Sequence, residues 1–204
     1  MITIDNHNFV GKGSHREVYR HPENQNLCIK IIVDGSSHSR PNRREISYHR
    51  HLERRGIAWD MIPKYHGDIT TNLGIGSVFD LVSDHDGAVS KTLGYYLSSN
   101  DVTEAHYDGL SRSLFLLKDY LLRYRIITKT LEHRNIVCQR NKSGIFRLSV
   151  IDSVVNLDFI PICNYIRFLA EKKIHRRWKR FERNLLGLFP HNKALDRMLT
   201  SSHR

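Results

Sequence analysis

The hydrophobic pattern of this chain changes its period once, and that change is the strongest constraint on the fold. Up to about residue 82, short apolar runs are bounded by Gly, Pro, Asn and Asp, as in β-strands joined by turns. Further along, five apolar residues recur at steps of four and three, the spacing of one helical face: Leu110, Leu114, Leu117, Leu121 and Tyr124. A sheet-rich first part and a helix-rich second part predict an α+β fold.

The first part is predicted to form a small antiparallel sheet with one helix packed on it. Its single helix is expected over Arg43–Gly56, where Ile46, His49 and Leu52 recur every three residues. Five strands are expected around this helix: Ile2–Val10, Glu17–Arg20, Leu27–Val33, Ile62–Gly67 and Leu73–Val82.

The second part is predicted to be compact and mainly helical. A long helix covers residues 110–124, and a hairpin follows, with strands Ile136–Gln139 and Phe146–Ile151. The remaining residues have a helical pattern. The 204 residues are enough for one two-lobed domain or for one large single-core domain, and the change of period divides them into residues 1–82 and 83–204.

Composition excludes several classes of protein. Hydrophobic residues make up 40% and charged residues 26%, as in soluble globular proteins. No apolar run approaches the about 18 residues of a membrane span, and the N-terminus lacks the pattern of a secretory signal. The three cysteines, Cys28, Cys138 and Cys163, are far apart and predict reduced thiols in a cytoplasmic protein. The thirteen histidines form no zinc-type spacing, so no structural metal is expected.

The net charge of +11 is concentrated at the C-terminus. Residues 165–204 hold eleven Lys or Arg against three Asp or Glu, and seven of the basic residues lie within KKIHRRWKRFER, 172–183. Apolar residues there recur at steps of four and three: Ile174, Trp178, Phe181, Leu185 and Leu188. The pattern predicts a helix whose apolar stripe lies in the core and whose cationic face stays exposed. That face could meet anionic lipid headgroups, a phosphorylated glycolipid or protein, or nucleic acid. Nucleic acid is the least favoured, because no zinc pair or RNP aromatic set occurs.

Two features of the N-terminal part suit a nucleotide. Gly11 and Gly13 are followed by Val18, between two strands; glycines let a backbone approach phosphates, and the valine can cover a flat ring. Lys30 lies in an apolar strand and needs an anionic partner, which phosphates and Glu45 at the start of the helix would supply. The alternatives are a plain β-turn at the glycines, an edge-strand lysine facing solvent and a solvated surface glutamate.

A third feature suits a divalent metal. Asn135 precedes one strand of the predicted hairpin, and Asp152 ends the other, in the run LSVID. Two oxygen ligands at neighbouring strand ends suit Mg²⁺, which keeps several waters and binds phosphates. The alternative is that both residues act as turn formers and caps.

The order Gly-x-Gly, Val, strand Lys, helix Glu, Asn and strand-end Asp resembles the protein-kinase-like fold. The segments GKGSHREVYRHPENQNLCIKI, TKTLEHRNIVCQR and HRRWKRF resemble more closely the YrbL group, small bacterial kinase-like proteins of the PhoP regulatory network. The resemblance extends from about Phe9 to Phe181. It implies one two-lobed domain, with an antiparallel sheet and one helix in an N-lobe, 1–82, and a reduced, compact helical C-lobe, 83–204, that ends in the basic helix.

The resemblance also implies roles for individual residues. Gly11 and Gly13 would cover the phosphates of ATP, and Lys30 would contact the α- and β-phosphates while paired with Glu45. Asn135 and Asp152 would bind Mg²⁺. The segment Phe79–Val82, with Asp80, falls at the junction of the lobes, where backbone groups would hold the adenine.

Two positions depart from the kinase pattern. Thr130 stands five residues before Asn135, where a catalytic aspartate is expected, and Glu132 stands where a lysine would contact the γ-phosphate. Loss of a general base costs about 10²–10⁴ in rate. Glu132 or His133 could replace it if the loop bends differently, and some activity could survive because phosphoryl transfer relies on positioning and electrostatics.

The leading hypothesis is an ATP- and Mg²⁺-binding kinase-like protein, either a weak or atypical kinase or a regulatory pseudokinase. Its candidate residues are Lys30 and Glu132 for catalysis, with nucleotide and metal contacts from Gly11, Gly13, Val18, Glu45, Asp80, Asn135 and Asp152. The alternative is a non-enzymatic module that docks an anionic membrane or nucleic acid through its basic helix. The expected location is the cytoplasm, with contact to the inner membrane as a further option.

Overall fold

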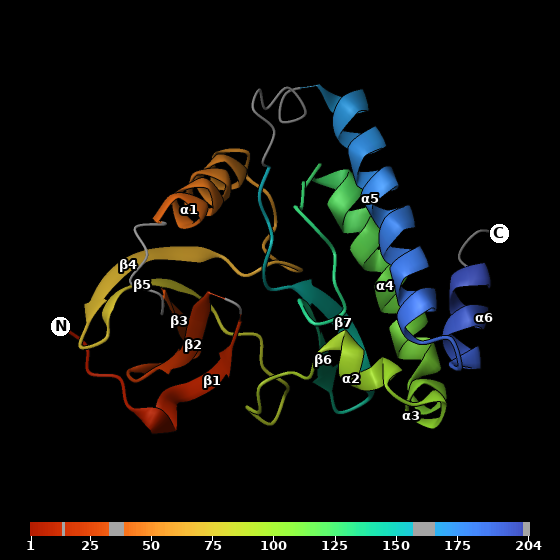
Figure 1. The fold of residues 1–204 in the computed structure, drawn as a ribbon, viewed down its shortest axis with the longest axis horizontal. Coiled ribbons are helices and arrows are strands. Elements are labelled where there is room, and N and C mark those ends of the chain that lie inside the picture. Colours follow the sequence, from red (N-terminus) through yellow and green to blue (C-terminus); the bar gives the residue numbers. More distant parts are fainter. Residues whose placement is uncertain (14, 33–38, 157–165, 202–204) are drawn as a thin grey trace.

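The computed structural model describes residues 1–13, 15–32, 39–156 and 166–201. An antiparallel sheet of five strands and helix α1 occupy one side of the molecule, and a group of helices with a two-stranded hairpin occupies the other (Figure 1). The strand order is β1-β2-β3-β5-β4. The strands are β1 (Phe9–Lys12), β2 (Arg16–His21), β3 (Asn24–Ile32), β4 (Tyr65–Thr71) and β5 (Gly74–Asp80). The α+β prediction is confirmed.

Helix α1 (Ser39–Arg54) is the helix predicted from the three-residue spacing. Ile46, His49 and Leu52 are all buried, at 9%, 3% and 0% exposure. The helix begins four residues before the predicted start at Arg43 and ends before Gly56, whose φ of +64° reverses the chain. Its inner face therefore carries aromatic, aliphatic and acidic side chains toward the centre of the molecule.

The second part contains helices α2 (Leu93–Leu97), α3 (Asn100–Ala105), α4 (Tyr107–Arg123), α5 (Arg167–Leu188) and α6 (Lys193–Ser201). Strands β6 (Ile136–Asn141) and β7 (Gly144–Val150) form the predicted hairpin. Helix α4 packs closely on β7 because Gly109 has no side chain; a Cβ there would lie 2.6 Å from the carbonyl oxygen of Ile145. The hairpin is thus fixed against α4.

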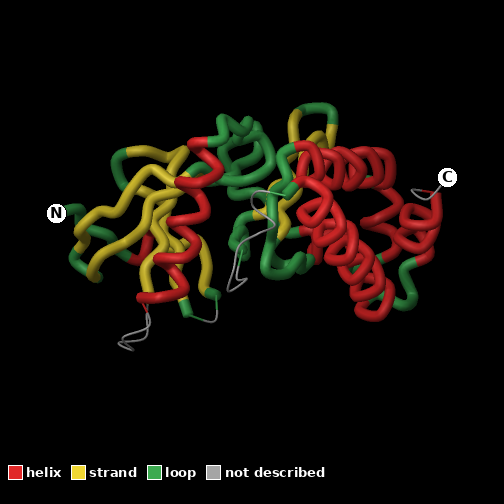
Figure 2. The backbone as a smooth tube through the Cα atoms, turned by 90° about the horizontal axis from the view of Figure 1, so that it is seen from above, coloured by secondary structure: helices red, strands yellow, loops and turns green. Residues whose placement is uncertain are grey.

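The apolar side chains divide into a small cluster and a large one. The small cluster lies within the sheet and includes Ile29, Ile31 and Val78. The large cluster fills the helical part and also takes in Tyr48 and Leu52 from α1. Figure 2 shows the five-stranded sheet and α1 at one end, and the long helices with the β6–β7 hairpin beside them toward the other. Helix α1 therefore joins the sheet to the helical part.

Several strand predictions differ from the structure at their ends. Ile2 forms only an isolated bridge to Thr71, so the strand expected over Ile2–Val10 is limited to β1. The strand expected at Ile62 begins at Tyr65 instead. Ile62 and Pro63 are buried, and Pro63 has no N–H to donate to a ladder, so this apolar run serves the core rather than the sheet. The predicted strand end at Val33 lies outside the described residues.

Helix α5 confirms most of the predicted C-terminal stripe. Ile174, Trp178, Phe181 and Leu185 are buried at 4% exposure or less. Leu188 is 58% exposed, contrary to the prediction, because it lies at the last residue of the helix. Among the described residues, no helix has the length and apolar character needed to cross a bilayer.

The thiols of Cys28 in β3 and Cys138 in β6 are buried and free. Both lie within strands. Cys163 lies outside the described residues.

Candidate functional site

Arg16 joins three parts of the chain that are distant in sequence. It begins β2, and its guanidinium donates to Glu45 in α1 and to Asp152, which follows β7. The Nη1–Oε2 distance to Glu45 and the Nη2–Oδ1 distance to Asp152 are both 2.6 Å. Glu45 is 6% exposed, and a carboxylate so deeply buried is costly without a charged partner. The sheet, α1 and the β6–β7 hairpin therefore meet at one arginine.

Lys30 lies beside this contact, near the end of β3. It is 9% exposed; its Nζ donates to the carbonyl oxygen of Ile151 at 2.7 Å and lies 4.4 Å from the centre of the Phe79 ring. Lys30 was expected to pair with Glu45. In the structure, Glu45 accepts from Arg16, and Lys30 donates to the residue before Asp152. We refer to Arg16, Lys30, Glu45 and Asp152 as the Arg16 cluster.

Neighbouring charges stabilise the ionised carboxylate of Asp152, and a backbone N–H of the next residue donates to it. Burial acts to raise the pKa of Asp152, but the charges of Lys30 and Arg16 and hydrogen bonds from Ser153 and Arg16 hold that pKa below its ordinary value. The Ser153 N–H donates to Oδ1 at 2.6 Å. Ser153 has a φ of +65°, a left-handed conformation that costs a non-glycine residue about 1–2 kcal/mol. The backbone is therefore strained at the residue whose N–H orients the Asp152 carboxylate.

Asn135 and Asp152 are brought together by the hairpin, as the sequence predicts. Ile136 opposes Val150 in the β6–β7 ladder, and the Ile151 N–H donates to the carbonyl oxygen of Asn135 at 2.9 Å. The Lys129 N–H donates to the carbonyl oxygen of Ser153 at 2.7 Å, so the loop before Asn135 also lies against the chain after Asp152. Among the described residues, no group of three or more His, Cys, Asp and Glu could hold a metal ion, so a metal here would depend on Asn135 and phosphate oxygens.

The glycine segment lies at the turn between β1 and β2. Gly11 pairs with Val18 across the hairpin, and the Gly13 N–H donates to the carbonyl oxygen of Arg16 at 2.8 Å. A Cβ built on Gly11 would meet no atom within 4 Å. Val18 in turn lies opposite Lys30 in the β2–β3 ladder. The glycine turn and Val18 are therefore neighbours of the Arg16 cluster.

Asp80 lies at the end of β5 and is engaged within the sheet. Its carboxylate accepts from the Lys64 N–H at 2.8 Å and bonds the Nε2 of His66 at 2.6 Å. The Asp80 N–H donates to Lys64 O, and the Leu81 N–H donates to Asn26 O. These bonds hold the start of β4 against the end of β5. Asp80 therefore helps to fix the position of the chain where β5 ends.

The loop 128–135 carries the two departures from the kinase pattern. Thr130 is partly buried, and the carboxylate of Glu132 accepts from Arg134 Nε at 2.6 Å. The ring of His133 packs edge-on against Phe189 and leaves no room for a side chain at Gly94. Burial and the charge of Arg134, against the opposing charge of Glu132, lower the pKa of His133. Of the two side chains proposed as substitutes for a base, His133 is held by packing on Phe189 and Glu132 by its ion pair with Arg134.

His49 forms an apolar wall beside the Arg16 cluster. Its ring stacks on Trp59 and meets Phe79 edge-on, at centroid distances of 5.8 and 5.3 Å. Burial, with the charges of Lys30 and Arg16, lowers the pKa of His49 to about 3. Its Nδ1 has no hydrogen-bond partner in the part of the chain that the structure describes. The ring is therefore neutral at physiological pH.

This neutral histidine predicts a pH dependence of stability. The folded-state pKa lies below the unfolded value of about 6.5, so the stabilisation is complete above about pH 6.5 and is lost as the pH falls toward 3. Between about pH 8 and about pH 5, His49 should account for a loss of about 2 kcal/mol. His49→Phe keeps the aromatic packing and removes the titration. Urea unfolding at the two pH values should show a pH dependence smaller by that amount, and an unchanged dependence would contradict the assignment.

Arg16 is the residue that the sequence analysis did not single out. The signal for it was the two-residue period of β2, which places Arg16 and Val18 on one face, opposite Ile32 and Lys30 respectively. An arginine on the same face as a buried lysine indicates a shared anionic partner.

Comparison with known proteins gives a consistent relationship. Residues 2–186 match the family model described as PhoP regulatory network protein YrbL. The chain is 36% identical over 182 residues to an uncharacterized protein YrbL of Escherichia coli (strain K12), covering 89% of this chain and 86% of that protein. The identity and coverage are the same for an uncharacterized protein YrbL of Shigella flexneri. The matched region includes every residue of the Arg16 cluster.

Proposed function

The chain belongs to the family described as PhoP regulatory network protein YrbL, and from the geometry of the Arg16 cluster we propose that it is a kinase-like protein that binds ATP with Mg²⁺. Under this proposal it is either a weak, atypical kinase or a regulatory pseudokinase. The family relationship supplies no substrate, so the proposal depends on the site itself.

The observation that carries the proposal is the convergence of two cations on one carboxylate. Lys30 and Arg16 both act on Asp152, although the three residues come from β3, β2 and the end of β7. The side chain of Arg16 is 20% exposed and that of Asp152 is 41% exposed, so the cluster is open on the Asp152 side. Arg16 and Lys30 have the charge and geometry to bind phosphate oxygens, since guanidinium groups bind such anions with two parallel donors.

The residues present suit a magnesium ion. Asp152 stays ionised because its pKa is lowered, and Asn135 is fixed beside it by the hairpin. These two would hold Mg²⁺, which would supply positive charge against the phosphates. Arg16 would exchange its contact with Asp152 for one with phosphate.

The surroundings suit the rest of a nucleotide. The open space at Gly11 would let the β1–β2 turn approach phosphates, and Val18 beside Lys30 would cover the base. Phe79, Asp80 and the following two residues would form the wall at the adenine. In this arrangement the carboxylate of Asp80 would hold the wall in position through its bonds to Lys64 and His66.

Binding is tested by a thermal shift. With Mg-ATP at about 100 times its Kd, the wild-type Tm should rise by about 5 °C or more, because binding to the folded state alone adds about 2.7 kcal/mol. Asp152→Ala should lose most of the shift, and ATP with excess EDTA should give less than Mg-ATP. A wild-type Tm that does not respond, or an equal response in Asp152→Ala, would overturn the proposal.

Phosphoryl transfer is tested separately by turnover of radiolabelled ATP. We expect slow release or transfer of the labelled phosphate, and a rate about 100-fold lower for Glu132→Gln, because Glu132 would act in place of the missing aspartate. Arg134→Gln, which frees Glu132 from its ion pair, is the matched variant and should keep or raise the rate. Intact binding without any turnover would identify a pseudokinase.

A further inference from the structure

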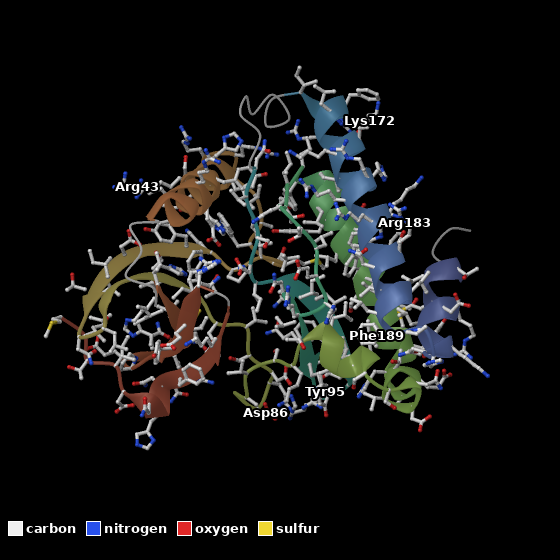
Figure 3. All side chains as sticks on the ribbon, in the orientation of Figure 1. Arg43, Asp86, Tyr95, Lys172, Arg183 and Phe189 are labelled. Atoms are coloured by element: carbon white, nitrogen blue, oxygen red, sulfur yellow. The ribbon has the colours of Figure 1, made fainter. Side chains whose placement is uncertain are left out.

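Helix α5 presents a second charged surface, separate from the Arg16 cluster. An open groove of about 980 Å³ runs along one face of α5 and is closed at one side by Leu199 and Thr200 of α6. Basic side chains supply its middle part: Lys172, His175, Arg176, Lys179 and Arg183. We refer to these five residues, with Phe168 and Leu186, as the α5 groove. Figure 3 shows Lys172 and Arg183 on α5, on the side of the molecule away from the sheet.

The acidic residues of this face do not cancel its charge. Glu171 pairs with Arg167 at 2.7 Å. Glu182 is 6% exposed and accepts from the Trp178 indole N–H at 2.7 Å. Four Lys or Arg line the groove against these two glutamates, one of which is already paired with Arg167, so the groove keeps a net positive charge. An anionic partner is the complement of this surface.

Apolar side chains lie at the two ends of the same groove. Phe168 is 67% exposed and Leu186 is 37% exposed. They are eighteen residues apart, which is about five helical turns or about 27 Å, so they point in the same direction. Between them the face is cationic, without the continuous apolar stripe at i, i+3, i+4 and i+7 that a docked partner helix requires. Nucleic acid would leave both apolar anchors without a partner.

We propose that the α5 groove docks the chain on the surface of a membrane that contains anionic phospholipids. The basic side chains would contact lipid phosphates, and Phe168 and Leu186 would enter the headgroup region at the two ends. The inference is independent of the nucleotide site, since no residue of the Arg16 cluster lines the groove.

The test is flotation of the full-length protein with vesicles of equal parts phosphatidylglycerol and phosphatidylcholine, without nucleotide. The wild type should bind these vesicles, should not bind pure phosphatidylcholine, and should lose binding as salt rises. The triple variant Arg176→Gln, Lys179→Gln, Arg183→Gln should bind on the order of 100-fold more weakly. Phe168→Ser with Leu186→Ser should weaken binding about tenfold at unchanged charge.

The matched control removes the same charge from another helix. Arg43, Arg44 and Arg54 are exposed on α1, and Figure 3 places Arg43 on the opposite side of the molecule from Lys172. Glutamine at these three positions should change vesicle binding by no more than about threefold if the site is the α5 groove. Equal losses of vesicle binding in the two triple variants would show that binding depends only on net charge, and would overturn the proposal. Absence of wild-type binding to the anionic vesicles, or tighter binding to a polyglutamate peptide or duplex RNA than to vesicles, would overturn it as well.

Discussion

Arg16→Gln is expected to lower the free energy of unfolding by about 3 kcal/mol, because it leaves the buried carboxylate of Glu45 without its charged partner and weakens the support of Asp152. Glu45, with a side chain that is 8% exposed, loses the partner at 2.6 Å, and Asp152 loses one of its two nearby charges. The same arginine joins the sheet to α1 and to the hairpin, so the loss should weaken contacts among all three. Urea unfolding at neutral pH measures the change.

A control separates this effect from the removal of any paired arginine. Arg134 also bonds one carboxylate at 2.6 Å, but its side chain is 73% exposed and that of Glu132 is 33% exposed. Arg134→Gln should change stability by less than about 0.5 kcal/mol. Arg16→Lys, which keeps the charge and loses the two-armed geometry, should fall between the two. Similar small changes in all three variants would show that the Arg16 contacts do not stabilise the fold.

Lys30→Met is expected to raise the Kd for Mg-ATP about 100-fold, since a hydrogen bond to a charged group contributes about 1.5–3 kcal/mol and the ammonium also neutralises phosphate charge. Methionine keeps most of the volume beside Phe79, so the fold should lose only about 1 kcal/mol, for the unpaired carbonyl of Ile151. Calorimetric titration measures the affinity. Lys12→Met provides the control, because Lys12 is 59% exposed and pairs with Glu17 on the β1–β2 hairpin. An equal change of affinity in both variants would remove Lys30 from the site.

The sequence predicts the elements of this fold where burial sets the period. The three-residue spacing of Ile46, His49 and Leu52 gave α1, and four of five stripe residues in α5 are buried as predicted. The ends of strands were less predictable. Ile62 and Pro63 form an apolar run that resembles a strand, but both are buried outside the sheet and Ile62 packs in the large cluster. Pattern alone cannot distinguish the two uses of such a run.

Part of the candidate site was also predictable from short-range sequence patterns. The hairpin brings Asn135 and Asp152 together, and it was predictable because its two expected strands, Ile136–Gln139 and Phe146–Ile151, lie close in the sequence. The partners of Glu45 were not local. Whether Glu45 meets Lys30 or Arg16 depends on how α1 lies across the sheet, which no short-range pattern encodes, and Arg16 reaches it from a neighbouring strand.

The central claim is that Lys30 and Asp152 act on one triphosphate with its metal, and a double-mutant cycle tests it most directly. The Kd for Mg-ATP is measured for wild type, Lys30→Met, Asp152→Asn and the double variant. If both side chains act on the same bound group, the double variant should lose at least about 1 kcal/mol less than the sum of the single variants. Losses that add to within about 0.5 kcal/mol, or affinities that no variant changes, would contradict the claim.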